Sequence, residues 1–370
     1  MSVLPIASSV LTPPPSFTVE VDSISEPEWN SLLGRFADAS IYQTWAYGAV
    51  CLGEKQFSHL VLKRGANIVA AAQLWIVRVP ILNCGIAYLR WGPLWRLRGE
   101  PVDPGLFNDM LASLRVEYVD RRGLLLRLLP AEFREDIWAS EISSCLQRQG
   151  LDLENKINPY HTSRLDVSQP LETVRKGLNS RWRNYLRAAE KSGYTVLQGT
   201  ADELYDQFSV LYREMMARKR FDTTVDIEEF RQIQKRLPES LKMQVFVCTA
   251  DGQPQNSLVV SALGDSAIYL LAATGNAGLN GRGAYLLQWR AIEWLHQQGI
   301  RWYDTGGLNQ EKNPGGYQFK SGLGGQEVSH LGRFELRENW LSAAATRVGE
   351  RSRDLVARVR SFGRQTRAPV

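Results

Sequence analysis

Cysteine and histidine are scarce in this chain of 370 residues, which has four of each. The cysteines lie far apart without metal-ligand spacing, and four scattered histidines do not favour a zinc site, so we assign no metal. Thiols without a disulfide framework are typical of a reducing compartment, which favours the cytoplasm. No apolar run reaches the roughly 18 residues that a transmembrane helix needs.

The N-terminus lacks the basic residues of a signal peptide. The apolar stretch from Val3 to Leu11 has no Lys or Arg before it and runs into Pro13-Pro14-Pro15. A secretory signal needs positive charge ahead of its apolar segment. We therefore expect residues 1–16 to form a disordered leader.

Acidic residues are few at the C-terminal end. The net charge is +5, and residues 347–367 contain seven arginines against Glu350 and Asp354, so the rest of the chain is close to neutral and is not a general nucleic-acid binder. We expect residues 336–370 to form a basic amphipathic helix. Such a helix could lie on an anionic membrane or pack on the first domain. Its apolar stripe would contain Leu341, Val348, Leu355, Val359 and Phe362.

The predicted elements follow an order that occurs twice. A chain of this length favours two domains, which we place at residues 17–158 and 159–335. In the second, three strands joined by tight turns precede a strand–glycine loop–helix–strand unit, and the first has a similar plan. This is the order of acetyltransferase-like (GNAT) folds, an α/β (α+β) class with mixed central sheets flanked by helices. Its repetition suggests duplication.

Several short motifs make this likeness more specific. Over residues 38–336 the chain resembles the Fem-type (FemABX) non-ribosomal peptidyltransferases, which have two GNAT-like domains. The compact length leaves no room for the coiled-coil arm of some members. The motifs that carry the resemblance are Gln43-Thr44-Trp45, Arg90-Trp91-Gly92-Pro93, Arg181-Trp182-Arg183-Asn184, Tyr303-Asp304-Thr305-Gly306-Gly307 and Tyr317-Gln318-Phe319-Lys320-Ser321-Gly322.

The resemblance implies an aminoacyltransferase of peptidoglycan and cell-wall biogenesis. Its donor would be aminoacyl-tRNA, with no tightly bound cofactor, and its acceptor an amine of a nucleotide- or lipid-linked precursor. The cysteines favour a cytoplasmic enzyme, and the basic C-terminal helix could bring it into peripheral contact with the inner membrane surface. One departure puts the precursor's identity in doubt, because Val50 and Cys51 stand where such enzymes often have a lysine, and Lys55 is the next candidate.

Lys320 and Asp304 are the candidate catalytic residues. The resemblance implies that Lys320 contacts the precursor diphosphate, and a fixed cation also stabilises the oxyanion that forms when an amine attacks an ester. We place Lys320 in a glycine-rich loop, where the alternative is a surface lysine capping a β-bulge. Asp304 ends a strand before Thr-Gly-Gly and could orient the amine or accept its proton, or it could only initiate a turn.

Other residues are candidates for binding. We predict one helix over residues 171–192. Arg183, Arg187 and Lys191 fall on one face of it, which could hold tRNA or diphosphate phosphates, or could simply be solvated. A glycine loop before a helix could cradle pyrophosphate, or could be a flexible connection. We assign Gly281, Arg282 and Gly283 to this loop site. We predict that the residues which bind the substrate are Phe319, Tyr317, Arg218, Trp45, Tyr47, Arg183 and Arg187. Phe319 and at least one of Trp45 and Tyr47 could instead serve packing.

Two other functions remain open. A coenzyme A-dependent N-acyltransferase of a sugar or exopolysaccharide precursor would keep the fold and change the donor to acyl-CoA. A non-catalytic scaffold at the membrane surface would use the arginine-rich tail.

Overall fold

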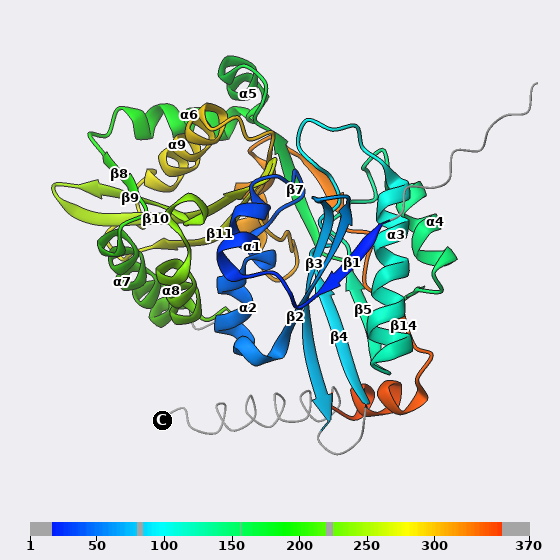
Figure 1. Cartoon of the computed structure of the whole chain (residues 1–370). Coiled ribbons are helices and arrows are strands. Elements are labelled where there is room, and N and C mark those ends of the chain that lie inside the picture. Colours follow the sequence, from blue (N-terminus) through cyan, green and yellow to red (C-terminus); the bar gives the residue numbers. More distant parts are fainter. Residues whose placement is uncertain (1–16, 80–83, 156, 220–224, 350–370) are drawn as a thin grey trace, which may run out of the picture.

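The computed structural model describes residues 17–79, 84–155, 157–219 and 225–349, so the predicted leader lies outside the described residues. Two mixed sheets of seven strands form the frame of the molecule (Figure 1). The predicted fold class is confirmed: two GNAT-like units follow one another in the chain, each a mixed sheet flanked by helices.

The first sheet has the strand order β1-β2-β3-β4-β5-β14-β6, in which only β4 and β5 are parallel. Helices α3 and α4 cover one face, and α1 and α2 lie toward the second sheet. The elements are β1 Thr18–Val21, α1 Glu26–Leu33, α2 Trp45–Leu52, β2 Phe57–Arg64, β3 Asn67–Val79, β4 Cys84–Arg90, α3 Pro104–Leu114, a π-helix Arg115–Arg121, β5 Leu125–Leu129, α4 Ala139–Arg148, β6 Asp152–Leu153 and β14 Phe334–Leu336.

The second sheet has the order β8-β9-β10-β11-β12-β7-β13, with β11 and β12 as its parallel pair. Helices α6 and α9 cover its outer face, while α7 and α8 face the first domain. The elements are β7 His161–Asp166, α5 Leu171–Gly177, α6 Ser180–Glu190, β8 Thr195–Gly199, α7 Asp202–Lys219, α8 Ile227–Arg236, β9 Gln244–Ala250, β10 Gln253–Leu263, β11 Ser266–Thr274, α9 Gly283–Gln297, β12 Trp302–Asp304, α10 Pro314–Ser321 and β13 Gln326–Ser329.

One strand crosses from the second half of the chain into the first sheet. The sixth position of the first sheet belongs to β14, which follows every strand of the second sheet in the chain; the sixth position of the second sheet belongs to β7, which precedes the other strands of that sheet. Strand β14 begins at Phe334, so the last residues of the range predicted for the second domain, 159–335, belong to the first sheet. A buried ion pair fixes it, because Arg127 Nε of β5 donates to Glu335 Oε1 of β14 at 2.6 Å.

One hydrophobic cluster joins the two domains. Trp29 of α1 and Tyr47 of α2 belong to the same cluster as Tyr205 and Phe208 of α7 and Val259 of β10. The middle layer of helices thus has sheet on both sides, and burying its apolar surface stabilises both domains together.

The first motif of the chain is part of this packing. The buried Gln43 side chain donates from its amide to the Arg90 carbonyl, and its Oε1 accepts from Gln73 N at 3.3 Å. Thr44 caps α2 by accepting from Tyr47 N at 3.2 Å. The two resemblance motifs of the first domain are therefore bonded to each other and set the path of the chain after β4.

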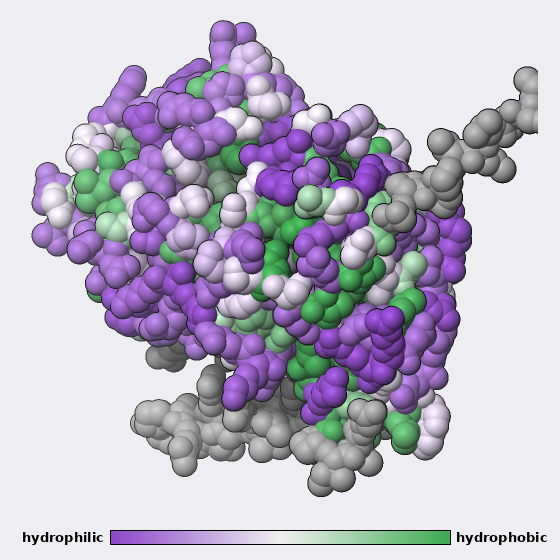
Figure 2. Space-filling model, in the orientation of Figure 1, coloured by the Kyte–Doolittle hydropathy of each residue, from purple (hydrophilic) through white to green (hydrophobic). Residues whose placement is uncertain are grey.

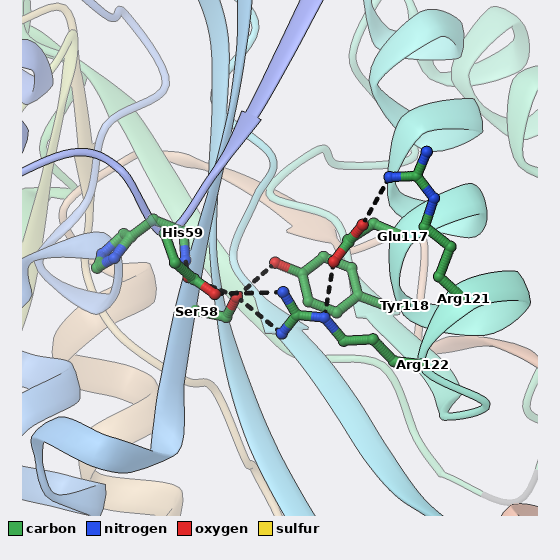
Figure 3. A network of polar contacts seen from close by, with 7 residues as sticks. Ser58, His59, Glu117, Tyr118, Arg121 and Arg122 are labelled. Carbon is green, nitrogen blue, oxygen red and sulfur yellow. Dashed lines mark hydrogen bonds and ion pairs between the residues drawn. The ribbon is translucent and has the colours of Figure 1, made fainter.

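A polar network ties β2 to the π-helix (Figure 3). The Tyr118 hydroxyl lies 2.8 Å from Ser58 Oγ, and Arg122 Nη1 donates to the same oxygen at 3.4 Å. Glu117 in turn accepts from Arg122 Nε at 2.7 Å. These bonds satisfy polar groups that the sheet and helix bury between them.

Several elements differ from the sequence-based expectation. The single helix predicted over 171–192 is two helices, because Leu178 is extended and Asn179 caps α6 by accepting from Trp182 N at 2.7 Å. Lys320 belongs to helix α10 and not to a loop. Of the predicted C-terminal helix, residues 340–349 are described and helical, and the remainder lies outside the described residues.

Candidate functional site

A cleft opens where strands β11 and β12 separate. Their parallel pairing ends at Ile268 and Asp304, after which β11 continues to Thr274 paired with β10. Gly306 has a φ of +79°, and a Cβ there would lie 2.9 Å from the Tyr269 carbonyl oxygen, so the turn out of β12 requires glycine. The resulting cleft has a volume of about 540 Å³ and is lined by β11, α7, α9 and α10.

Lys320 extends from α10 into this cleft. Its Nζ donates to the Gly307 carbonyl at 3.0 Å and lies 5.0 Å from the centre of the Tyr269 ring. Burial lowers the pKa of Lys320 to about 8, while the charge of Asp304 acts in the opposite direction. The ammonium is thus mostly charged at neutral pH, close to the point where it can lose its proton.

Asp304 is buried at the end of β12. Its carboxylate accepts from Thr162 Oγ1, from Gly306 N at 2.8 Å and from the Tyr160 hydroxyl at 3.2 Å. Burial raises its pKa, and these hydrogen bonds together with Lys320 oppose the rise. Asp304 also lines a second cleft of about 520 Å³ between the domains, so it lies between the two cavities.

Two further polar groups line the first cleft. Lys219, at the end of α7, is exposed and has no ion pair with any carboxylate of the described residues. The Ser257 hydroxyl on β10 is buried and has no hydrogen-bond partner within the described part of the chain. The cleft therefore offers a cation at its exposed side, a second cation deeper in, and a hydroxyl able to bond a ligand.

The predicted basic residues lie mostly outside the cleft. Arg218 donates to the Thr274 carbonyl at 2.8 Å and to Asn276 Oδ1 at 2.6 Å, so it braces the loop after β11. Arg183 donates to the carbonyls of Lys176 (2.7 Å) and Leu178, at the end of α5. Arg187 is exposed on α6, away from the residues that line either cleft.

The predicted pyrophosphate loop is closely packed against its neighbours. The Tyr194 hydroxyl accepts from Arg282 N at 3.3 Å, and a Cβ at Gly281 would lie 2.3 Å from that hydroxyl. A Cβ at Gly283 would lie equally close to Asn256 Oδ1. The space next to these glycines is therefore filled by Tyr194 and Asn256 of the protein. The backbone amide of Arg282 already has a hydrogen-bond acceptor in Tyr194.

The aromatic candidates divide between the cleft and the core. Phe319 lines the cleft beside Lys320, and its ring centre lies 5.0 Å from that of Tyr285. Tyr317 turns toward β13 and donates to Glu327 at 2.8 Å. Trp45 stacks on His59, and the buried Tyr47 accepts from Arg90 Nη1 at 3.0 Å. Neither Trp45 nor Tyr47 lines the cleft.

Sequence reasoning did not assign five residues that contact or line the site, namely Tyr269, Lys219, Ser257, Tyr160 and Thr162. Tyr269 and Ser257 lie on strands whose alternating pattern reads as ordinary sheet. Lys219 follows Arg218 at the end of α7, and this run of positive charge in the sequence was the signal that pointed to the position. The contacts of Tyr160 and Thr162 with Asp304 depend on the antiparallel pairing of β7 with β12, which are about 140 residues apart in the chain.

Comparison with known proteins supports the fold. The acetyltransferase (GNAT) domain model matches residues 173–321. The crystal structure of FemX has a TM-score of 0.74 at 15% identity, covering 87% of this chain and 98% of that one. A conserved protein of unknown function from Bacteroides thetaiotaomicron has a TM-score of 0.56 at 9% identity, covering 86% and 99%. No curated protein sequence matches the chain.

These likenesses establish a Fem-type double GNAT fold for the chain, and the domain match supports a transferase. No helix of the described residues combines the length and the hydropathy needed to cross a bilayer.

Proposed function

We propose that the protein is an aminoacyltransferase that moves an activated acyl group onto an amine of a cell-envelope precursor. The observation that carries the proposal is the position of Lys320, whose ammonium lies in the cleft at the separated ends of β11 and β12. The GNAT match supports acyl transfer, and the likeness to FemX favours aminoacyl-tRNA as donor and a peptidoglycan precursor as acceptor.

The reaction needs little covalent chemistry from the protein. A neutral amine attacks the carbonyl carbon of an ester, a C–N bond forms, and the C–O bond to the carrier breaks. The carbonyl oxygen carries negative charge in the transition state, and the Lys320 ammonium stabilises it there. The proton of the amine passes to the leaving oxygen, directly or through water.

Asp304 supports this cation from behind. Its oxygens are engaged by Thr162, Tyr160 and the Gly306 amide, so its role in the proposal is to keep Lys320 protonated and not to take the amine's proton itself. The carboxylate thereby offsets part of the burial that lowers the pKa of Lys320.

Strand β11 supplies the means to orient an extended substrate. Beyond Ile268 its edge toward β12 has no partner strand among the described residues, so backbone groups from Leu270 to Thr274 face the cleft. An extended peptide or acyl chain can bond to such an edge as an added strand. Lys219 would hold the anionic part of the substrate where the cleft meets solvent.

The test measures transfer by the purified full chain. Transfer of a labelled amino acid from charged tRNA to a nucleotide-linked or lipid-linked pentapeptide should occur, and Lys320→Met should lower its rate by about 100- to 1000-fold. Failure of every charged tRNA, under conditions where the protein is folded, would reject the assigned donor.

The second candidate is a coenzyme A-dependent N-acyltransferase of a sugar or other envelope precursor. It is favoured by the acetyltransferase domain match over residues 173–321. The packed loop of Gly281, Arg282 and Gly283 counts against it, because the Arg282 amide that would bind pyrophosphate is bonded to Tyr194. Tight binding of acetyl-coenzyme A by calorimetry would favour this candidate over the first.

A further inference from the structure

The helix over residues 340–349 packs on the protein through small residues and exposes its large apolar residues to solvent. Ser342 and Ala343 are buried, at 0% and 8% exposure, whereas Trp340 is 73% exposed and Leu341 44%. A helix that only packs on its own domain would bury the large side chains, since these lose the most apolar surface to water.

The helix is fixed in this orientation by hydrogen bonds. Ser342 Oγ donates to the Gly123 carbonyl at 2.7 Å and accepts from Gly85 N at 3.0 Å. The Asn339 side chain donates to the same Gly123 carbonyl at 2.9 Å and caps the helix by accepting from Ser342 N at 3.1 Å. Trp340 and Leu341 are therefore held outward by an anchored helix.

Positive charge surrounds this face. Arg78 lies opposite Gly85 in the β3–β4 pairing, next to the Ser342 contact, and Arg347 follows on the helix itself. Both are exposed, and neither has a carboxylate partner within the described ranges. In the sequence the chain then continues through six more arginines from 351 to 367 against Asp354.

The same end of the molecule presents the neighbouring strand ends. Figure 1 shows the helix, in red, lying across the lower ends of β3 and β4. Val77 near the end of β3 is 50% exposed, and in Figure 2 hydrophobic atoms reach the surface at this lower end. Trp and Leu beside arginines are the composition that inserts at the boundary of an anionic bilayer.

We propose that Trp340, Leu341, Arg78 and Arg347 form a docking face for an anionic phospholipid membrane. The two apolar side chains enter the headgroup boundary, and the arginines contact lipid phosphates. A lipid surface fits better than a nucleic acid, because the centre of the face is apolar. It consists of the Trp340 indole and the aliphatic Leu341 side chain, with arginines beside them. The inference is independent of the acyl-transfer proposal, since docking requires no substrate.

Vesicle sedimentation of the full chain tests the face directly. The protein should co-sediment with vesicles of phosphatidylcholine and phosphatidylglycerol at 3:1, and only weakly with phosphatidylcholine alone. Raising the salt from 0.1 to 0.5 M should weaken binding, because the Debye length shortens. Trp340→Ser/Leu341→Ser should lower the partition coefficient by at least about tenfold. Arg78→Gln/Arg347→Gln should lower it about 25-fold, at about fivefold per arginine.

The matched control is Val210→Ser on α7, which removes an apolar side chain of similar exposure, 53%, from another surface. It should bind vesicles as the unchanged protein does. Because all the altered side chains are exposed, circular dichroism should show that each variant melts like the parent.

Three results would overturn the proposal. The first is no co-sedimentation with the anionic vesicles. The second is equal binding by the Trp340→Ser/Leu341→Ser variant. The third is a concentration-dependent dimer that this variant dissociates, because the outward face would then belong to a second copy of the chain.

Discussion

The ammonium of Lys320 lies 5.0 Å from the centre of the Tyr269 ring, with the Gly307 carbonyl as its hydrogen-bond acceptor. These two contacts hold the ammonium in place without neutralising it, because neither the ring nor the carbonyl carries a full negative charge. The positive charge therefore remains available to a ligand that enters the cleft.

The first prediction concerns the loss of this cation. Lys320→Met should lower kcat/KM for acyl transfer by about 100- to 1000-fold, the size of effect seen when one donor to an oxyanion is removed. Steady-state kinetics with the intact donor and acceptor would measure the change.

Lys312→Met is the matched control, since Lys312 is exposed in the segment leading to α10. It should keep full activity. A folded Lys320→Met protein with unchanged kcat/KM would remove Lys320 from the mechanism. The substitution should not lower thermal stability, because it deletes a cation whose burial opposes its charge.

The second prediction is the pH dependence of transfer. With a Lys320 pKa of about 8, the stabilising ammonium is present below that pH and is lost as the pH rises through it. The alkaline limb of the kcat/KM profile should therefore fall near pH 8. Lys320→Arg keeps its charge to much higher pH, so its limb should move upward even if its maximum rate is lower. An identical alkaline limb in both proteins would show that another group controls it.

The third prediction assigns binding to Lys219. Lys219→Met should raise KM for an anionic acceptor about tenfold and leave kcat unchanged, because the contact is made equally in ground and transition states. The effect should shrink at high salt. Lys235→Met, an exposed lysine on α8, should change neither constant. A fall in kcat alone for Lys219→Met would contradict a binding role.

The fourth prediction concerns the ion pair that holds β14 in the first sheet. Glu335→Ala removes the carboxylate between the buried Arg127 and the Arg337 guanidinium, and should cost about 3 kcal/mol of unfolding free energy. Denaturant unfolding would measure it. These cations hold the pKa of Glu335 below its usual 4.5, so its contribution is present above that pH and disappears on acidification through the lower, folded-state pKa.

Glu338→Ala provides the comparison for Glu335. Glu338 pairs with Arg115 at the surface, where its side chain is 46% exposed, and an exposed pair contributes about 0–1 kcal/mol. Equal losses for the two variants would mean that the buried pair does not fix β14.

The fifth prediction concerns Glu132, which is 3% exposed and accepts from Trp95 Nε1 at 2.8 Å. Burial raises its pKa to about 7. The folded state thus holds the proton more tightly than the unfolded state, and its stabilising contribution is lost as pH rises from 4.5 toward 7. Glu132→Gln should therefore gain stability relative to the parent as pH rises, by roughly 3 kcal/mol in total once the pH is well above 7. Melting curves at pH 5 and pH 8 check this, and a constant difference would refute it.

Local patterns predicted most of the fold. Glycine turns such as Asp251-Gly252 and Gly264-Asp265 separate three strands, and each signal depends on neighbours in the chain, so the GNAT order was readable. The break between α5 and α6 was missed because its apolar and basic residues continue a helical period across Leu178. The short strand β14 was missed because its partners, β5 and β6, are about 200 residues away in the chain.

The candidate site was only partly predictable. Gly306, Gly307 and Lys320 are dense enough in one segment to suggest a ligand, and they do meet at the cleft. Tyr269 and Ser257 lie at the same cleft because of how β10 and β11 pair. No sequence motif indicates that pairing. Trp45 and Arg183 show the converse, because a motif position or a charge run can equally serve packing and helix capping.

The crossing of β14 into the first sheet also constrains how the protein is made. A ribosome that has finished residue 158 has synthesised β5 and β6 but not the strand that belongs between them, and about half the chain must follow before β14 emerges. During that interval the nascent first sheet presents open edges to other chains, the condition that invites chaperone binding or misassembly. Cutting the gene after residue 158 would therefore yield an N-terminal fragment that lacks β14, the strand between β5 and β6, and this fragment should not be recovered as a stable monomer.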